Sequence, residues 1–384
     1  MERCRVCGGE RLDEVVGYSA LARVTSDCKR FAPGGWLAQC PDCSTVQKRD
    51  DAAWRADCAA IYAAYDNYSL SGGVEQAVRS GTTGEYGPRS ELVLSAVAAR
   101  IRLPANGTLL DYGCGKGPTS TAAARVLPGW TIDGYDLDDR AQDALRRIPG
   151  FRRLYAGERS AIAGRYDLIV LTHTLEHIPD AREALTFLAT RLNPGGHIIV
   201  QVYDRVTNPY DLIVADHMFH FDACALNRMS EASGLATAFL ARNVVTKELT
   251  LAASAGSASP PRVDPSPRVD PSPLADPREQ VQWLLQSAEA CRSAATQRPF
   301  GLFGTSIVAT WLTGELGRAP DFYVDEDPAK QGLEMEGAPI LAPHDVASGA
   351  TVGFAMAPVV AAAVRERLRD LPVRFVLPPA YPVS

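Results

Sequence analysis

The feature that most constrains the fold is the segment TLLDYGCGKGPTSTAAARVL, residues 108–127. An apolar run leads into a turn with glycines at Gly113, Gly115 and Gly117, and a helical pattern follows. A strand, a glycine turn and a helix in this order place the helix N-terminus beside the end of the strand. The segment therefore predicts the first unit of a parallel sheet covered by helices, with a ligand site at the turn.

The residues around this segment continue the alternation of strand and helix. Apolar runs predict strands at 107–112, 131–135, 152–155, 167–172 and 196–203, and helical patterns occupy 118–127, 139–147, 180–192 and 223–233. The stretch ATAFLARNVVTKELTLAAS (236–254) predicts two more strands without a helix between them. We expect these two strands to close the sheet as an antiparallel hairpin.

The 384 residues divide into four regions by composition. Residues 1–70 carry six of the nine cysteines, and residues 71–253 form the alternating core. Residues 254–277 contain RVDPSP twice in tandem, and residues 278–384 begin with a helical pattern. Proline at the density of 254–277 disfavours both helix and sheet, so we expect an extended linker there. The last region predicts a helix and a second, smaller α/β domain.

Charge and hydropathy exclude some functional classes. The net charge is −6, without a basic stripe, which is atypical of proteins that bind nucleic acid or anionic membranes. No run of about 18 apolar residues is present, and the N-terminus MERCRVCGGE lacks the apolar stretch of a secretory signal. We therefore expect a cytoplasmic protein with reduced cysteines, and the sequence leaves its oligomeric state open.

Two C-x-x-C pairs predict a metal site. Cys4 and Cys7 form the first pair, and Cys40 and Cys43 form the second. Two such turns supply four thiolates for a closed tetrahedral zinc site, and a site filled by protein ligands is structural. The alternative is unrelated thiols, with one pair acting as a redox site. The remaining two cysteines of this region, Cys28 and Cys58, fit buried small apolar positions.

Asp111 decides between two cofactor classes at the glycine turn. A carboxylate at the strand end repels a pyrophosphate but attracts an ammonium group. S-adenosylmethionine (SAM) carries an ammonium and a sulfonium and has no phosphate. Pro118 stands where the dinucleotide fingerprint has its third glycine, whereas Lys116 is a feature against SAM. The turn therefore favours SAM over a nicotinamide dinucleotide, which stays the alternative.

Two later strand ends add candidate cofactor contacts. Asp136, followed by Leu137, ends the second strand, where an acid accepts hydrogen bonds from ribose hydroxyls. His173 ends the fourth strand, at the edge where open parallel sheets bind ligands. Glu176 and His177 follow it, and the sequence leaves open whether they cap and pack a helix or act in catalysis.

The order of these motifs resembles a known family. Two cysteine knuckles, then LLDYGCGKG, GYDLDD, YDLIVLTHTLEHI and LNPGG, then a second α/β block, resemble the SAM-dependent C-methyltransferases of deoxysugar biosynthesis. The resemblance implies an N-terminal zinc domain, a class I methyltransferase core with a Rossmann-like fold, and a C-terminal Rossmann-like domain. It also implies a small-molecule acceptor, a nucleotide-linked 4-keto sugar that is methylated on a ring carbon.

The segment ADHMFHF (215–221) resembles the H-E-H-x-x-x-F signature of that family, with Asp216, His217 and Phe221 at matching positions. Three positions depart from the family. Ala215 replaces the first histidine of the signature, Val214 replaces a tyrosine before that histidine, and His220 replaces a later tyrosine. These departures remove polar groups expected to face the sugar, so a different acceptor or transfer to oxygen is an open alternative.

Three interpretations of His217 and His220 compete. A metal site needs a third ligand, and Asp216 points away from His217 on either a helix or a strand. Two packed core histidines form the second interpretation. The third assigns His217 as the base that forms an enolate, Asp216 as the residue that positions the loop or the imidazole, and His220 as a second polar contact. We adopt the third as our hypothesis.

Two further regions carry weaker candidates. Tyr65 and Tyr68, between the cysteine module and the core, match family tyrosines near the sugar or the methionine tail, or else pack the two modules together. In the last region, Gly301, Gly304 and Asp325 follow a Rossmann-like pattern. That domain either closes the cleft, holds the nucleotide of the acceptor, or binds NAD in an oxidoreductase. A non-catalytic subunit with a decayed core is a further alternative, against which the intact glycine turn argues.

Overall fold

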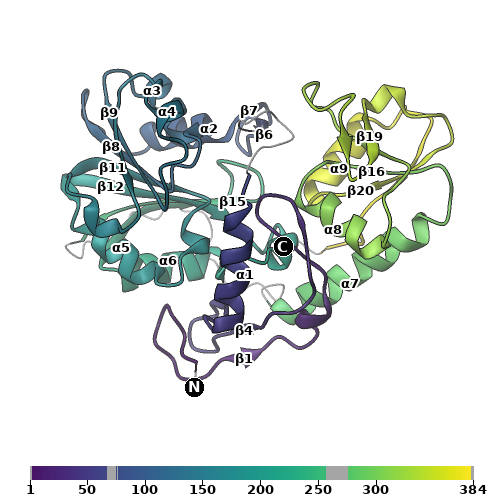
Figure 1. Ribbon diagram of the computed structural model, residues 1–384, viewed down its shortest axis with the longest axis horizontal. Helices are drawn as coiled ribbons and strands as arrows, with labels where there is room; N and C mark the ends of the chain where they lie inside the picture. The colour runs from purple at the N-terminus through teal and green to yellow at the C-terminus, as the bar shows by residue number, and fades with distance from the viewer. Residues whose placement is uncertain (1, 67–74, 76, 257–275, 382–384) are drawn as a thin grey trace.

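The computed structural model describes residues 2–66, 75, 77–256 and 276–381. Three parts are visible in Figure 1: the alternating core on the left, the C-terminal domain on the right, and the N-terminal module below and between them. Within the described residues, no helix has both the length and the apolar character needed to cross a membrane.

The core is a seven-stranded sheet in the order β10-β9-β8-β11-β12-β15-β14. All neighbouring pairs are parallel except those that involve β15, which is antiparallel to both β12 and β14. The strands are β8 (Thr108–Tyr112), β9 (Thr131–Asp136), β10 (Phe151–Ala156), β11 (Tyr166–Thr172), β12 (Leu192–Tyr203), β14 (Leu235–Ala241) and β15 (Glu248–Ala255). The five predicted strands and the closing hairpin are confirmed.

Helices cover both faces of this sheet, as the apolar strands require. The predicted helices are α3 (Pro118–Val126), α4 (Gln142–Leu145), α5 (Ala181–Ala189) and α6 (Ala223–Ala232), and α2 (Arg89–Ala98) precedes the sheet. Successive residues of a strand point to opposite faces. Leu109 therefore packs with the cluster of α2 and α3, whereas Leu110 packs with that of α5 and α6. This arrangement is the predicted Rossmann-like methyltransferase fold.

The N-terminal module is built around a small sheet in the order β1-β4-β5-β13. Its own strands are β1 (Asp13–Glu14), β4 (Leu37–Gln39) and β5 (Val46–Lys48); a hairpin of β2 (Arg23–Val24) and β3 (Arg30–Phe31) and helix α1 (Ala52–Ala63) complete it. The fourth strand, β13 (Phe219–His220), comes from the core and pairs with β5. Part of the predicted catalytic segment is therefore a strand of the N-terminal sheet.

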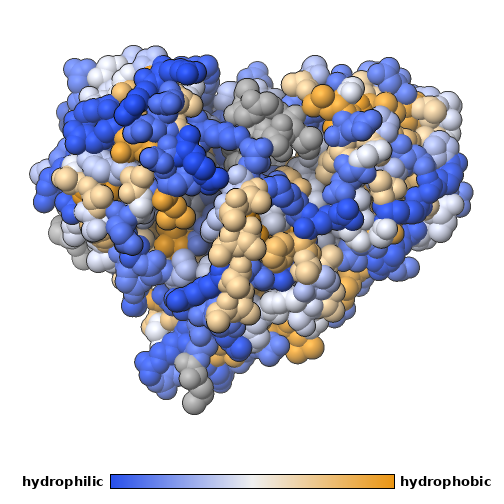
Figure 2. Space-filling view, viewed as in Figure 1, coloured by the Kyte–Doolittle hydropathy of each residue, from blue (hydrophilic) through white to orange (hydrophobic). Residues whose placement is uncertain are grey.

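This module also joins the two larger parts through its apolar residues. Cys4, Cys40 and Trp54 share a cluster with the core sheet, α5 and α6. Tyr18 and Leu37 share another with helices α7 (Pro277–Ala294) and α8 (Ile307–Leu316) of the C-terminal domain. The outward side of α1 is lined by small alanines, and it forms the pale strip at the centre of the face in Figure 2.

The C-terminal domain is a second, smaller α/β unit, as predicted. Helix α7 (Pro277–Ala294) leads into a sheet in the order β18-β19-β17-β16-β20-β21, in which only the β18–β19 pair is antiparallel. The strands are β16 (Phe300–Phe303), β17 (Phe322–Val324), β18 (Glu334–Met335), β19 (Ala338–Leu341), β20 (Thr351–Phe354) and β21 (Arg374–Val376), and the helices α8 (Ile307–Leu316) and α9 (Pro358–Arg367) pack on them.

Two connections differ in detail from the sequence-based expectations. A hairpin of β6 (Ala77–Arg79) and β7 (Tyr86–Pro88) links the N-terminal module to the core. Residues 257–275 of the predicted linker lie outside the described residues. The ends of that linker are regular structure, since Ser254 pairs with His197 in the core sheet and Pro277 begins α7.

Candidate functional site

The glycine turn between β8 and α3 leaves space above its backbone. Gly113 has φ +79, and a Cβ there would lie 2.5 Å from the Thr174 side chain. Gly117 has φ +87, and a Cβ there would lie 2.6 Å from Leu145. Gly115 has φ +48, yet a Cβ there would meet no atom within 4 Å. The outer glycines are thus required by close packing, while the middle one faces the open space that a bound cofactor needs.

Asp111 lies below this turn rather than in the open space. It is 1% exposed, and one carboxylate oxygen accepts hydrogen bonds from the Ser120 backbone N–H at 3.0 Å and from the Ser120 hydroxyl at 2.7 Å. Burial raises the pKa of Asp111 to about 7. The visible contacts of Asp111 therefore tie the turn to the first turn of α3, and an attraction to the cofactor ammonium stays a prediction.

Asp136 lies at the end of β9, directly beside the turn. Its two carboxylate oxygens accept hydrogen bonds at 2.7 Å from the backbone N–H groups of Gly115 and Leu137. Burial raises the pKa of Asp136. The Leu137 side chain next to it is 68% exposed and offers an apolar surface beside the acid. Lys116 points away from this position and pairs with Asp66 at 2.7 Å.

His173 follows β11 with a left-handed backbone, φ 48, at the same edge of the sheet. Its ring packs on Tyr203 with centroids 4.4 Å apart, and its Nε2 lies 3.3 Å from the Glu248 carboxylate. Burial alone would lower the pKa of His173, but Glu248 and Glu176 outweigh burial and raise it to about 8. Arg89, which donates to Glu248 at 3.0 Å, completes this buried ionic group.

A cluster of histidines and carboxylates lies beside the turn. His217 Nδ1 and His220 Nδ1 each lie 2.8 Å from one carboxylate oxygen of Asp211. Asp216 does not contact the His217 ring in this arrangement. It accepts from the Ser26 N–H at 2.9 Å and lies 3.3 Å from His177 Nδ1. The acid that faces the predicted base is therefore Asp211, and Asp216 faces a different histidine.

The cluster is mostly closed to solvent. The side chains of His217 and His220 are 2% and 0% exposed, whereas those of His177 and His173 are 17% and 18% exposed. His177 also lies 3.2 Å from the Tyr62 hydroxyl, and its ring meets that of His217 edge-on with centroids 4.7 Å apart. A molecule at the sheet edge would thus meet His177 before it reached His217.

One short segment connects the cofactor turn to the histidine cluster. Thr174, which packs against Gly113, begins it, and the Glu176 carbonyl accepts a hydrogen bond from the Met218 N–H at 2.7 Å. The segment that follows β11 is therefore in contact with the glycine turn on one side and with the 215–221 segment on the other.

Sequence patterns did not single out Asp211, and they left open whether His177 packs a helix or acts in catalysis. Asp211 lies in a short 3-10 helix (Pro209–Ile213) outside the matched motif, and its spacing from His217 follows no helix or strand period. The one feature of the sequence that pointed to Asp211 was an acid close in sequence to two histidines. Tyr65, a predicted substrate contact, has its hydroxyl 3.3 Å from the Ser26 hydroxyl and its ring against Tyr62. Tyr68 lies outside the described residues.

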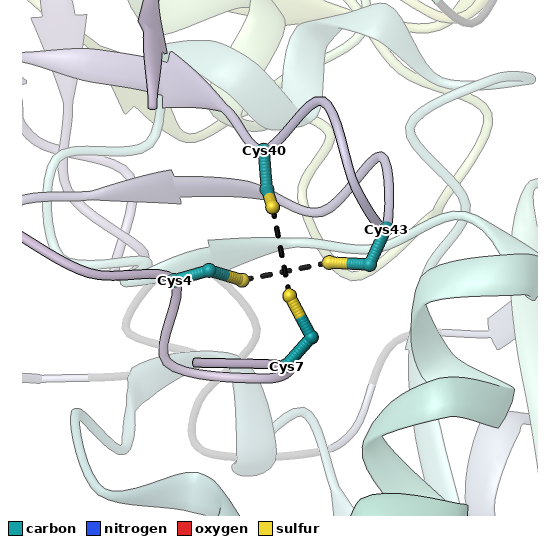
Figure 3. A group of neighbouring side chains, drawn as sticks. All are labelled: Cys4, Cys7, Cys40 and Cys43. Carbon is teal, nitrogen blue, oxygen red and sulfur yellow. Dashed lines mark hydrogen bonds between the residues drawn. The ribbon is translucent and has the colours of Figure 1, made fainter. Parts of the chain in front are cut away.

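The four predicted metal ligands converge, as Figure 3 shows. The Cys4 and Cys43 sulfurs are 3.5 Å apart, the Cys7 and Cys40 sulfurs are 3.6 Å apart, and all four lie within 4.8 Å of one another. Zn–S bonds of about 2.3 Å place the sulfurs of a tetrahedral site about 3.8 Å apart. The donor set and spacing therefore fit zinc, with no position left for a substrate.

In the Rossmann-like turn of the C-terminal domain, the acid forms its contacts with residues of the same domain. Gly304 has φ +108 after β16, and Gly301 packs against Phe322. Asp325, at the end of β17, accepts a hydrogen bond from Thr305 and pairs with Lys330 at 3.0 Å. Its carboxylate thus holds this turn together.

Comparison with known proteins agrees with the geometry of the core. Residues 89–238 match the family model described as a methyltransferase domain. Residues 89–238 form a class I SAM-dependent methyltransferase domain. The match begins at α2 and ends within β14, so it contains the glycine turn, Asp136 and the histidine cluster.

Curated relatives are similar to this chain over part of its length. A ubiquinone biosynthesis O-methyltransferase from Shewanella pealeana is 27% identical over 110 residues, and one from Marinobacter nauticus is 30% identical over 147 residues. These matches cover 27% and 35% of this chain, and 46% and 59% of the relatives, so the chain spans about half of their length. A solved structure of CalO1, a methyltransferase in calicheamicin biosynthesis, is 17% identical with a TM-score of 0.37, over 44% of this chain and 53% of that one.

Proposed function

We propose that this protein transfers a methyl group from SAM to a carbon beside the ketone of a nucleotide-linked 4-keto deoxysugar. The observation that carries the proposal is the contact of the 174–176 segment with both the glycine turn and the 215–221 segment. This contact joins a cofactor site to imidazoles backed by buried carboxylates. The order of the three modules, which resembles the sugar C-methyltransferases, supports the choice of acceptor.

The hydrogen-bonding groups at the cofactor turn, and the space that the turn leaves, fit SAM. Gly115 leaves space for the cofactor, Asp136 supplies acceptors for ribose hydroxyls, and the exposed Leu137 supplies an apolar contact. We assign His173 to the methionine end of the site, where it is held by Glu248. SAM supplies an electrophilic methyl group, and the fold needs no further cofactor for the transfer.

The chemistry requires one base. The ketone acidifies the proton on the neighbouring carbon, and the imidazole of His217 is suited to remove it at cell pH. The electrons of the C–H bond then form the enolate, whose carbon bonds to the methyl carbon as the sulfur–methyl bond breaks. In this assignment His177, the more exposed histidine, contacts the acceptor, and Asp216 holds its imidazole.

The departures from the family signature lie in the protein interior. Val214 and Ala215 are 1% and 0% exposed. Their side chains are apolar and buried, and their backbone carbonyls accept hydrogen bonds from Lys48. The polar contacts that the resemblance expects there must then come from His177, His220 or Tyr65 in this protein.

Transfer to oxygen is the second candidate. The two ubiquinone biosynthesis relatives are O-methyltransferases by name. The same histidine cluster would then remove a proton from a hydroxyl group instead of a carbon. The net charge of −6 is atypical of proteins that act on nucleic acid, and in both candidates we take the acceptor to be a small molecule.

Product analysis separates the two candidates. Purified protein is incubated with SAM labelled with carbon-13 in its methyl group and with a nucleotide-linked 4-keto deoxysugar, and carbon NMR reports the product. A labelled methyl bonded to a ring carbon is the expected result. A methyl on oxygen supports the second candidate, and failure of all transfer while SAM binds would refute the sugar as acceptor.

We further propose that the four cysteines hold one structural zinc ion. The sulfurs already lie near tetrahedral spacing in two turns that are fixed by backbone hydrogen bonds, Cys4 N–H to Gly9 and Ser44 N–H to Cys40. Zinc at this position would hold the loop between β4 and β5 against the segment that precedes β1, and would thereby fix β5, the strand that pairs with β13.

A further inference from the structure

Asp211 lies between the two histidines of the 215–221 segment as a bridge. One carboxylate oxygen is 2.8 Å from His217 Nδ1 and the other is 2.8 Å from His220 Nδ1. The Asp211 side chain is 3% exposed, so this bridge is closed to bulk water. Backbone hydrogen bonds to Asn208 and from Val214 hold the turn on which Asp211 lies.

The charge of Asp211 determines where the protons lie. Burial would raise the pKa of this carboxyl group, but the two imidazoles outweigh burial and hold it below its usual range. An ionised carboxylate is only an acceptor of hydrogen bonds. Both imidazoles must therefore carry a proton on Nδ1. Burial lowers the pKa of His220 to about 4, so this ring is neutral at cell pH and has its lone pair on Nε2.

The other acids near the cluster are engaged elsewhere. Asp216 contacts Ser26 and His177. Glu176 lies 3.2 Å from His173 Nδ1; one of its carboxylate oxygens is also within 4.8 Å of a His217 ring nitrogen, but it forms no hydrogen bond with His217, unlike Asp211. Lys48, the nearest buried cation from the N-terminal module, donates to the backbone carbonyl of Ala215. Asp211 is thus the acid placed to set the tautomer of His217.

We propose that Asp211 is a positioning residue that fixes the Nδ1–H tautomer of both His217 and His220. Its effect is to leave Nε2 of His217 as the proton acceptor toward the substrate. The catalytic consequence rests on the proposed function, in which His217 is the base. The tautomers themselves do not depend on the acceptor and can be measured without it.

A bound cation is the competing explanation for this cluster. Asp211, His217 and His220 present ligand atoms close enough together to hold a metal ion. A nitrogen that donates its proton to Asp211 has no lone pair for a metal, so hydrogen bonding and coordination at Nδ1 exclude each other. Tautomer and metal content therefore distinguish the two explanations.

Nitrogen NMR of the full chain labelled at its histidines tests the proposal. The sequence has six histidines, so each ring can be assigned by single substitutions. At mildly alkaline pH we expect protonated Nδ1 and unprotonated Nε2 for His217 and His220. The opposite tautomer in either ring would overturn the proposal, and so would a second equivalent of metal that Asp211→Asn removes. The tautomers are read from the unmodified protein, and the single substitutions serve only to assign the signals.

Asp211→Asn provides the second test. A carboxamide offers one acceptor and one donor group, so it can keep only one of the two rings in the Nδ1–H form, and the other ring must change tautomer. We expect kcat to fall by about 10²–10⁴-fold, as for loss of the orienting acid in other His–Asp pairs, with the SAM dissociation constant little changed. Unchanged tautomers in both rings would overturn the proposal.

Asp204→Asn is the matched control. Asp204 is also fully buried, lies seven residues earlier, and accepts from the Val206 N–H at 3.1 Å without contacting a histidine. We expect its substitution to leave both tautomers unchanged; a change equal to that of Asp211→Asn would overturn the assignment to the bridge. Asp211→Asn could change a tautomer while the wild type transfers no methyl group to any acceptor. That result would support the positioning role and refute the proposed function.

Discussion

The Lys48 ammonium group donates a hydrogen bond to the backbone carbonyl of Ala215 at 2.9 Å, and it also contacts the carbonyl of Val214. The Lys48 backbone N–H donates to Met218 at 2.8 Å. One residue of the N-terminal module thus holds both ends of the stretch that contains Asp216 and His217. Because Lys48 is 1% exposed, these contacts are not replaced by water when they are lost.

Lys48→Met should therefore loosen the predicted catalytic segment. The variant leaves buried carbonyls without their main donor, which costs about 1–3 kcal/mol of unfolding free energy. We expect kcat to fall while SAM binding is retained, measured by urea denaturation, turnover and calorimetry. Arg55→Met serves as the control, since Arg55 is an exposed cation of the same module that pairs with Asp50. An equal loss of kcat in both variants would contradict a specific role of Lys48.

His217→Ala tests the base directly. Removal of a general base typically lowers the rate by about 10²–10⁴-fold, and we expect this loss in kcat with little change in the SAM dissociation constant. His344→Ala, an exposed histidine of the C-terminal domain, should leave both quantities unchanged. Near-normal turnover by His217→Ala would assign the proton transfer to another group, with His177 the next to be tested.

Asp136→Asn should weaken SAM binding. The amide keeps the shape of the side chain but replaces one acceptor of ribose hydrogen bonds with a donor, so we expect a loss of about 10-fold or more in affinity by calorimetry. Asp138→Asn is a close control, because Asp138 lies two residues later and pairs with the exposed Arg140. If both variants bind SAM like the wild type, Asp136 does not contact the ribose.

Removal of the metal should unfold the N-terminal module. We expect one equivalent of zinc per chain by metal analysis, lost in Cys7→Ser together with unfolding free energy on the order of several kcal/mol. Turnover should fall as well, because β13 depends on its pairing with β5. Cys224→Ser, a partly buried cysteine outside the cluster, should keep the zinc. Full thermal stability of a zinc-free Cys7→Ser variant would contradict a structural metal.

The His173–Glu248 pair predicts a pH dependence of stability. The pKa of His173 is raised to about 8 in the folded protein, against about 6.5 when unfolded. The folded state therefore holds its proton more tightly, and this stabilisation is complete below about pH 6.5 and is lost as the pH rises through about 8. We expect it to amount to roughly 1–2 kcal/mol.

Urea denaturation between about pH 6 and about pH 9 measures this contribution. The wild type should lose more unfolding free energy over this range than His173→Gln, in which the titrating group is absent. The comparison of the two proteins cancels groups that titrate equally in both. Parallel pH curves would show that the pair does not stabilise the fold.

Local sequence patterns were enough to predict most of the core. Strands β8, β9 and β11 were predicted almost to the residue, because each is a short apolar run bounded by a turn. Helix α4 is shorter than the predicted 139–147, since its ends form turns that propensity does not distinguish from helix.

The amino-acid sequence by itself determined which residues could carry chemistry: two cysteine pairs, a glycine turn, an acid after the second strand, and histidines near an acid. Only the tertiary structure decided which of them meet. The pairing of β13 with β5 joins residues more than 170 positions apart, and the turn at Asp211 brings its carboxylate between two imidazoles. Such contacts have no period in the sequence, because they arise from the packing of separate modules rather than from the geometry of one helix or strand.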